Sequence, residues 1–351
     1  MTQERSVVDN PGPSQVFAAA TGLPLQLVLQ ALNGLDDEAI RLLPQFVPQI
    51  PVVAHRLGLS VTGLILSIIA RGRHGLDNRL PVSRLDPTVP MHLAARRASF
   101  GVAFLTSADV LSFSGNEARL VAAAETMDGA YKNELRVPTA HPATAFLVSP
   151  QHAVTAGHAV CFRDPAAMHL VFGFTASTRL TNGGTHYVLD REHVVRVKRL
   201  IALRYDERLG DIALMELERH VPHHIGSPLP LAPAKSTKLL QEVAALSHAR
   251  AQPMKAIIRS VPPRDACFTY PLLLDETRRY IGTNLDTYRG SSGSPVIDAL
   301  GRVIGVQVRG LTEQTGGHEV PYSDLIAGSW ATRIELLRDA LAGIGVPLRP
   351  A

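Results

Sequence analysis

Short apolar runs separated by turn residues dominate the chain from about residue 97 onward. Runs such as ATAFLVS (143–149), DIALMEL (211–217) and VIGVQVRG (303–310) recur about every ten residues, and turn signals such as TNGG and DALG lie between them. Their length and β-branched composition are typical of strands. Many short strands at this spacing predict an all-β sandwich or barrel.

Both ends of the chain have a different pattern. Residues 1–14 are polar and contain two prolines, which predicts a disordered start. From 15 to about 75, apolar residues recur at helical three- and four-residue steps, and several prolines divide the segment into short pieces. The charged stretch 71–90, rich in turn residues, indicates a linker. WATRIELLRDALAGIG (330–345) predicts an amphipathic C-terminal helix that stops at glycine.

Composition and charge exclude some classes of protein. The net charge is +4, but basic residues come singly or in pairs and aromatic residues make up 5%, so we expect no nucleic-acid partner. The most apolar stretch, 57–70, has fourteen residues, whereas a bilayer span takes about twenty; we expect a buried helix and no membrane contact. The N-terminus lacks the pattern of a signal peptide, and there are only two cysteines, Cys161 and Cys267. We therefore expect a cytoplasmic protein, with export by another route left open.

The stretch GSSGSP (290–295) is either a plain turn or a catalytic loop. A turn needs only glycine and proline to set the backbone. A catalytic loop needs a serine that projects its Oγ into solvent, and it needs two converging backbone N–H groups to bind an oxyanion. Gly290 permits the close backbone approach that such a loop requires. Ser292 is the residue placed for attack.

A serine nucleophile also needs a base, and the base needs an orienting acid. The sequence TAGH ends at His158, where the preceding small residues let the imidazole approach another surface. Asp211 opens the apolar run DIALMEL, which would partly shield its carboxylate. The loop that holds His220, His223 and His224 offers no further ligand, so we expect no metal site and no cofactor.

Together, TAGH, GDIALMEL and GSSGSP resemble the trypsin-like (chymotrypsin-fold) serine peptidases, which share this His, Asp, Ser order. The stretch TNLDTYRGSSGSPVIDALGRVIGVQVRG is most similar to the bacterial branch that includes the V8-like and glutamyl endopeptidases. The resemblance covers about 97–345 and not 1–90. It implies a mainly β fold of two six-stranded antiparallel β-barrels with a C-terminal helix, preceded here by a small α-helical region.

The resemblance also implies domains and roles. We expect four parts: a disordered start (1–14), a helical domain and linker (15–90), a first barrel with His and Asp (91–228), and a second barrel with Ser and the C-terminal helix (229–351). Position by position, His158 is the base, Asp211 the orienting acid and Ser292 the nucleophile. The N–H groups of Gly290 and Ser292 form the oxyanion hole.

Two positions depart from the animal digestive enzymes. Ser291 stands where those enzymes have an aspartate that pairs with a new N-terminus after cleavage, and no IVGG-like start is visible. That activation route is therefore not expected. Ala159 stands where a cysteine often follows the histidine, so the usual neighbouring disulfide is absent, in agreement with a reducing compartment.

Substrate-binding residues are expected on both sides of the nucleophile. Asp286 lies six residues before Ser292, at the place of trypsin's specificity aspartate, and favours a basic P1 residue; a loop-bracing hydrogen bond is the structural alternative. The pair Asp286–Thr287 also recurs in the bacterial branch without trypsin specificity. Gln307 replaces the histidine of glutamate-specific members, and Arg309 either neutralises Asp286 or meets an acidic substrate side chain.

The sequence therefore predicts a serine endopeptidase that acts on protein or peptide substrates. Residues 15–75 are either a cap on the barrel or a segment that recruits a regulatory protein partner. The alternative is a trypsin-fold binding module without turnover that acts through the N-terminal helices.

Overall fold

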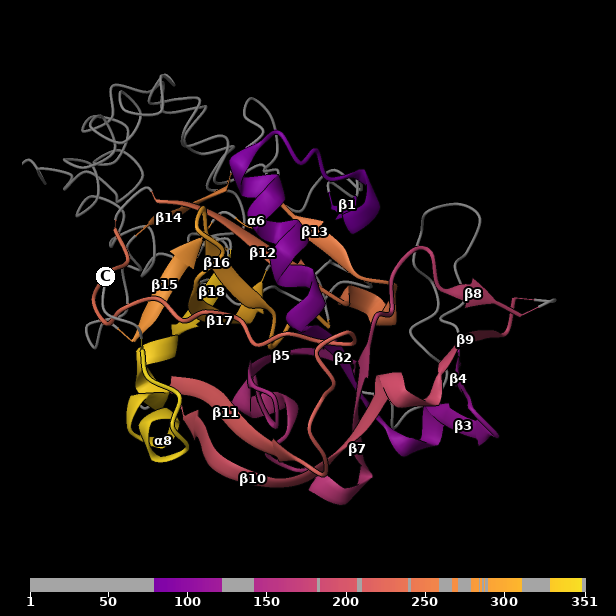
Figure 1. Cartoon of the computed structure of the whole chain (residues 1–351). Coiled ribbons are helices and arrows are strands. Elements are labelled where there is room, and N and C mark those ends of the chain that lie inside the picture. Colours follow the sequence, from indigo (N-terminus) through magenta and orange to yellow (C-terminus); the bar gives the residue numbers. More distant parts are fainter. Residues whose placement is uncertain are drawn as a thin grey trace, which may run out of the picture.

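A computed structural model gives the structure of the protein (Figure 1). It describes residues 79–348 except 122–141, 182–183, 207–209, 239–240, 259–266, 271–278, 284, 286, 288–289 and 311–328, and leaves out the side chains of 267–270 and 310. The predicted disordered start, the helical segment and the apolar stretch 57–70 lie outside the described residues. Among the described helices, none combines the length and apolarity needed to cross a membrane.

Six antiparallel strands close into a barrel, drawn mainly in magenta in Figure 1. Their order around the barrel is β10-β11-β6-β5-β2-β7. Alternate side chains point inward, as in any strand, so that Leu105, Leu147 and Met215 have no exposed surface. The strands are β2 (Val102–Ser107), β5 (Ala143–Ser149), β6 (His152–Thr155), β7 (Met168–Phe172), β10 (Val194–Asp206) and β11 (Gly210–Leu217).

The second half contains a sheet of eight strands, in the order β1-β13-β12-β14-β15-β18-β17-β16. Strand β12 also pairs with β16, so β12, β14, β15, β18, β17 and β16 form a second ring of six. The two barrels with a C-terminal helix confirm the predicted fold. The strands are β1 (Leu80–Pro81), β12 (Glu242–Ser247), β13 (Lys255–Ile257), β14 (Cys267–Tyr270), β15 (Tyr280–Thr283), β16 (Pro295–Asp298), β17 (Val303–Gly310) and β18 (Ser329–Arg333).

One apolar cluster joins the two barrels. It contains Val154 and Leu214 of the first barrel together with Leu246 and Val306 of the second. Burial of these side chains away from water fixes how the barrels meet. The described chain before the first barrel also packs on the second: β1 pairs with β13, and helix α6 (Pro90–Ala98) contacts β12 and β16.

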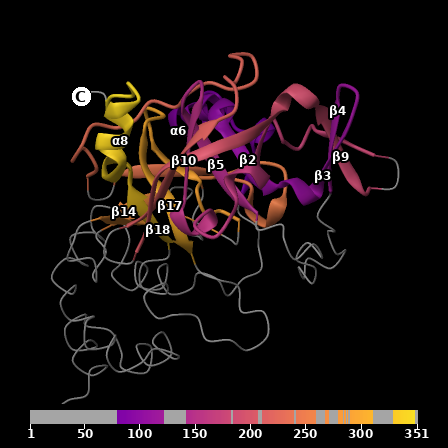
Figure 2. The ribbon, with the colours of Figure 1, turned by 90° about the horizontal axis from the view of Figure 1, so that it is seen from below.

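Two features differ from the pattern-based expectation. A separate four-stranded sheet, not predicted, has the order β3-β4-β9-β8. The helix expected over 330–345 is shorter, because 329–333 form strand β18 and helix α8 spans Arg338–Gly343. The four-stranded sheet and α8 lie at opposite ends of the molecule in Figure 1 and in Figure 2. The sheet consists of β3 (Leu111–Ser114), β4 (Glu117–Val121), β8 (Arg179–Leu180) and β9 (His186–Asp190).

Candidate active site

The register of the first barrel brings His158 and Asp211 together. Strands β6 and β11 are antiparallel neighbours, with Thr155 opposite Ala213. His158 comes three residues after Thr155 and Asp211 two residues before Ala213, so both leave the same edge of the barrel. Gly157 allows the turn to lie close to β10, because a Cβ at this position would come within 2.1 Å of a backbone oxygen.

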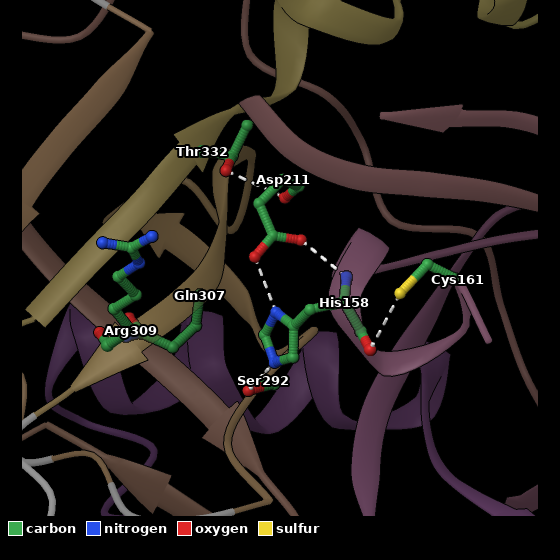
Figure 3. A network of polar contacts seen from close by, with 7 residues as sticks. All are labelled: His158, Cys161, Asp211, Ser292, Gln307, Arg309 and Thr332. Atoms are coloured by element: carbon green, nitrogen blue, oxygen red, sulfur yellow. Dashed lines mark hydrogen bonds and ion pairs between the residues drawn. The ribbon is translucent and has the colours of Figure 1, made fainter. Parts of the chain in front are cut away.

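Two hydrogen bonds, one from the imidazole and one from the backbone, hold His158 on Asp211. The His158 Nδ1 lies 2.6 Å from Oδ2 of Asp211, and the His158 backbone N–H donates to Oδ1 at 2.8 Å (Figure 3). Because a carboxylate accepts, Nδ1 carries the hydrogen, which leaves Nε2 of the neutral ring as an acceptor. Asp211 is buried, and its backbone oxygen accepts from Thr332 Oγ1 of the second barrel at 2.9 Å.

Ser292 meets the histidine from the other barrel. Its Oγ lies 2.8 Å from Nε2 of His158, across 134 positions of sequence (Figure 3). The structure thus places Asp211, His158 and Ser292 in one hydrogen-bonded chain. This is the arrangement in which a hydroxyl can lose its proton to an imidazole that a carboxylate orients.

The loop around Ser292 has the backbone that only glycines adopt readily. Gly290 has φ +89° and Gly293 has φ +86°. Among the described residues, neither the N–H of Gly290 nor that of Ser292 has a hydrogen-bond partner. The Ser291 carbonyl, which belongs to the same peptide unit as the Ser292 N–H, accepts from Ser294 N–H at 3.0 Å. Two backbone donors are thus available beside the Ser292 hydroxyl.

The four expected substrate-binding residues differ in position and burial. Asp286 lies outside the described residues. Thr287 is buried, with its Oγ1 2.7 Å from Ser329 Oγ. Gln307 is buried on β17, and its backbone oxygen accepts from the N–H of Gly293, the residue after Ser292, at 2.7 Å. Arg309 is half-buried on the same strand, near His158 and Ser292 (Figure 3), with its guanidinium 5.5 Å from the Trp330 ring centroid.

Sequence reasoning missed two aromatic residues beside the histidine. Tyr205 lies directly opposite Asp211 in the β10–β11 pairing, and its ring centroid is 6.4 Å from that of His158. Phe162, 89% exposed, contacts Tyr205 edge-on at 6.1 Å. The long β run before Asp211 was visible in the sequence, but its register with DIALMEL was not. These rings form an exposed apolar rim of the site.

One group in the described part of the chain has the ligand spacing of a cation site: Asp190, Glu192 and His193, whose ligand atoms lie within 4.8 Å of one another. The two carboxylates are exposed, and His193 Nδ1 donates to Phe172 O at 3.2 Å. Of the histidine cluster considered above, His224 lies 3.5 Å from Glu192. Asp190 ends strand β9 of the four-stranded sheet, and Glu192 and His193 lie in the turn that follows it. The hydrogen-bonded chain at Ser292 includes none of these residues.

Comparison with known proteins agrees with this geometry. Residues 143–306 match the family model of the trypsin-like peptidase domain. This range includes His158, Asp211 and Ser292. The resemblance to a trypsin-like peptidase domain is therefore confirmed over these residues, whereas the serine-protease activity and the narrower assignment to the V8-like branch stay predictions. No curated protein matches the sequence.

Several solved structures are similar. The active form of the Rv3671c protease from M. tuberculosis is 16% identical, with a TM-score of 0.43, over 78% of this chain and 90% of that chain. Its inactive form is 14% identical, with a TM-score of 0.41, over 77% of this chain and 100% of that chain. A scabies mite inactivated protease paralogue is 14% identical, with a TM-score of 0.44, over 70% of this chain and 93% of that chain.

Proposed function

We propose that the protein is a serine endopeptidase in which Ser292 is the nucleophile, His158 the general base and Asp211 the acid that orients it. The observation that carries the proposal is the continuous hydrogen-bond chain, 2.6 Å from Asp211 to His158 and 2.8 Å from His158 to Ser292. In a plain surface turn, nothing would require a serine of the second barrel to meet a histidine–aspartate pair of the first.

The reaction follows from this geometry. Ser292 Oγ attacks the carbonyl carbon of the scissile peptide bond while His158 Nε2 takes its proton. Nδ1–H of the resulting imidazolium keeps its bond to Asp211, which stabilises the positive charge. The oxyanion of the tetrahedral intermediate is bound by the N–H groups of Gly290 and Ser292. His158 then protonates the leaving amine, and water hydrolyses the acyl-enzyme with the roles reversed.

The substrate is a protein or peptide. For the residue before the scissile bond we propose a basic side chain that Asp286 recognises by charge, with an acidic side chain that meets Arg309 as the opposite outcome. Residues 15–75 are proposed to recruit or regulate through a protein partner. Mass-spectrometric profiling of the sites cleaved in a whole proteome decides the first point. Deletion of 1–78 and comparison of activity and captured partners decide the second.

The test of the proposed function is covalent labelling with a fluorophosphonate probe. Wild type is expected to react and Ser292→Ala not to react. Ser294→Ala is the matched control, because Ser294 is buried two residues away and its Oγ has no partner among the described residues. Asp211→Asn is expected to lower kcat for a peptide ester about 10⁴-fold, because the amide favours the wrong histidine tautomer. Equal labelling of wild type and Ser292→Ala rejects the proposal.

A further inference from the structure

We propose that Thr144, assisted by Ser247, is the positioning residue of the serine loop (residues 290–293) and holds its oxyanion-binding N–H groups ready without cleavage of the chain. The inference rests on the proposed function. Ser291 cannot form the ion pair that sets this loop in the digestive enzymes, so another interaction must hold the loop in place.

Thr144 is attached to the serine loop at two points. Its backbone N–H donates to Ser292 O at 2.8 Å, and its Oγ1 donates to Gly290 O at 3.1 Å. The same Oγ1 accepts from the backbone N–H of His248 at 3.0 Å, and Thr144 O accepts from Thr155 Oγ1 at 2.7 Å. Thr144 has no exposed surface. One buried residue of β5 thus accounts for hydrogen bonds to the carbonyls of both neighbours of Ser291, Gly290 and Ser292.

Hydrogen bonds to the loop carbonyls also restrict the direction of the N–H groups. In a trans peptide unit the C=O and the N–H point in opposite directions. The Ser291 carbonyl is held by Ser294, so the N–H of Ser292 points away from that bond. The Gly290 carbonyl held by Thr144 shares its peptide unit with the N–H of Ser291, so this bond fixes the backbone between the two oxyanion-binding N–H groups. Without these bonds, the loop would lose conformational entropy each time that it became ordered around the oxyanion, and the transition state would be stabilised less.

Ser247 holds the loop from its other side. Its Oγ donates to Ser291 Oγ at 2.8 Å and accepts from Ala249 N–H at 3.0 Å. Ser247 and Ser291 are each 1% exposed. The digestive enzymes have an aspartate at the position of Ser291, and that aspartate needs a charged partner. Here Ser291 instead makes a hydrogen bond between two neutral hydroxyl groups, with Ser247. No new N-terminus is required to balance it, which is why we expect the loop to be formed in the intact chain.

The test variant is Thr144→Val, which removes both bonds of Oγ1 but keeps the side-chain shape and the backbone N–H. We expect kcat for a peptide ester to fall about 10- to 100-fold, less than the loss on removal of a direct oxyanion donor, with KM within about twofold. The affinity for a peptide aldehyde, whose adduct carries an oxyanion, should fall in parallel with kcat. Affinity for a cleaved product peptide should not change, and Thr144→Ser, which restores the hydroxyl, should recover most of kcat.

Thr106→Val is the matched control. Thr106 is fully buried on the neighbouring strand β2, and its Oγ1 has no partner among the described residues. We expect it to leave both kcat and aldehyde affinity unchanged. Ser247→Ala gives a second measurement that leaves Thr144 intact and is expected to lower kcat about 3- to 10-fold with KM unchanged. If Thr144→Val does not fold, the kcat of Ser247→Ala alone tests whether hydrogen bonds to the serine loop contribute to catalysis.

The outcomes separate this inference from the proposed function. If wild type turns over substrate, and both Thr144→Val and Ser247→Ala equal Thr106→Val in kcat and aldehyde affinity, the positioning role is overturned. A loss that appears equally in kcat, KM and product affinity also overturns it, since that pattern indicates general damage to the fold. Absence of fluorophosphonate labelling in wild type contradicts the proposed function instead.

Discussion

The two barrels hold their parts of the site in different ways. In the first barrel, His158 and Asp211 are placed by the pairing of adjacent strands, and their mutual bonds lie within that barrel. In the second, Ser292 lies on a loop whose bonds run to Thr144 of the first barrel and, through Ser291, to Ser247 at the end of β12. The histidine–aspartate pair therefore depends on strand register, whereas the serine depends on contact between barrels.

The largest effect that this difference predicts is that of Gly293→Ala. A Cβ at Gly293 would lie 1.9 Å from Thr144 O and 2.2 Å from Thr155 Oγ1, and the φ of +86° adds strain for any L-residue. The loop must move away from the first barrel. We expect kcat/KM to fall about 100-fold or more, because a displacement of about 1 Å at a reacting group has that effect. Steady-state kinetics and fluorophosphonate labelling measure it.

Gly115→Ala separates steric contact from backbone strain. Gly115 also has a positive φ, +57°, but nothing lies within 4 Å of its added Cβ. We expect a loss of about 1 kcal/mol in the free energy of unfolding and normal activity. If Gly293→Ala retains wild-type activity, the serine loop does not depend on close contact with the first barrel, and the comparison above is wrong.

This division also explains how much the sequence could predict. The three site residues were found because each lies in a local motif, and their order along the chain resembled a known family. Thr144 and Ser247 carry no such motif, since their importance comes from hydrogen bonds to residues distant in sequence, between barrels for Thr144 and within the second barrel for Ser247. Tyr205 was missed because register is set by the whole sheet and not by nearby residues.

The error at the C-terminal helix has a similar cause. Residues 330–333 have apolar residues at spacings that a helix also allows, but their backbone pairs with β15 and β17, and Trp330 and Ala331 are buried in that sheet. Tertiary pairing prevailed over the local helical pattern. The four-stranded sheet was missed because its strands come from separate parts of the chain, 111–121 and 179–190.

A second prediction concerns pH and the second barrel. His248 follows β12, has no exposed surface, and stacks on Phe174 at 5.6 Å. Burial lowers its pKa to about 4 from 6.5, although its Nδ1 donates to Gln252 O. The unfolded chain therefore binds a proton between pH 6.5 and 4 that the folded protein does not. Stability is full above pH 6.5 and falls on acidification to about pH 4, by on the order of 3 kcal/mol.

Urea unfolding at pH 7 and at pH 4.5 measures this loss. His248→Gln, which cannot take up the proton, is expected to show a smaller difference between the two pH values than wild type. An equal difference in both proteins would mean that His248 is accessible to protons in the folded state. The region of β12 that supports the serine loop would then be looser than its packing indicates.

The smallest expected effect lies in the first barrel, at Glu216 of β11. Its carboxylate accepts from Lys198 Nζ at 2.7 Å and from Arg199 Nε at 2.5 Å, and these bonds lower its pKa to about 2 from 4.5. A lowered carboxyl pKa gives stability that is present above pH 4.5 and is lost as the pH falls to about 2. The effect is small because both basic side chains are largely exposed, 55% and 66%, and water screens the pair.

Glu216→Gln should therefore lower Tm slightly at pH 7, with the difference from wild type vanishing near pH 2 and decreasing at high salt. Its activity should equal that of wild type, because the strand ladder that places Asp211 does not depend on this ion pair. The acid losses at His248 and Glu216 fall in separate pH windows, above and below about pH 4. His152 of the first barrel lies opposite Glu216 and its pKa also responds to this carboxylate, so Glu216→Gln alone can change stability in the upper window. If Glu216→Gln changes the part of the loss that His248→Gln removes between pH 6.5 and 4, the two barrels share one electrostatic unit, and the distinction between them does not hold.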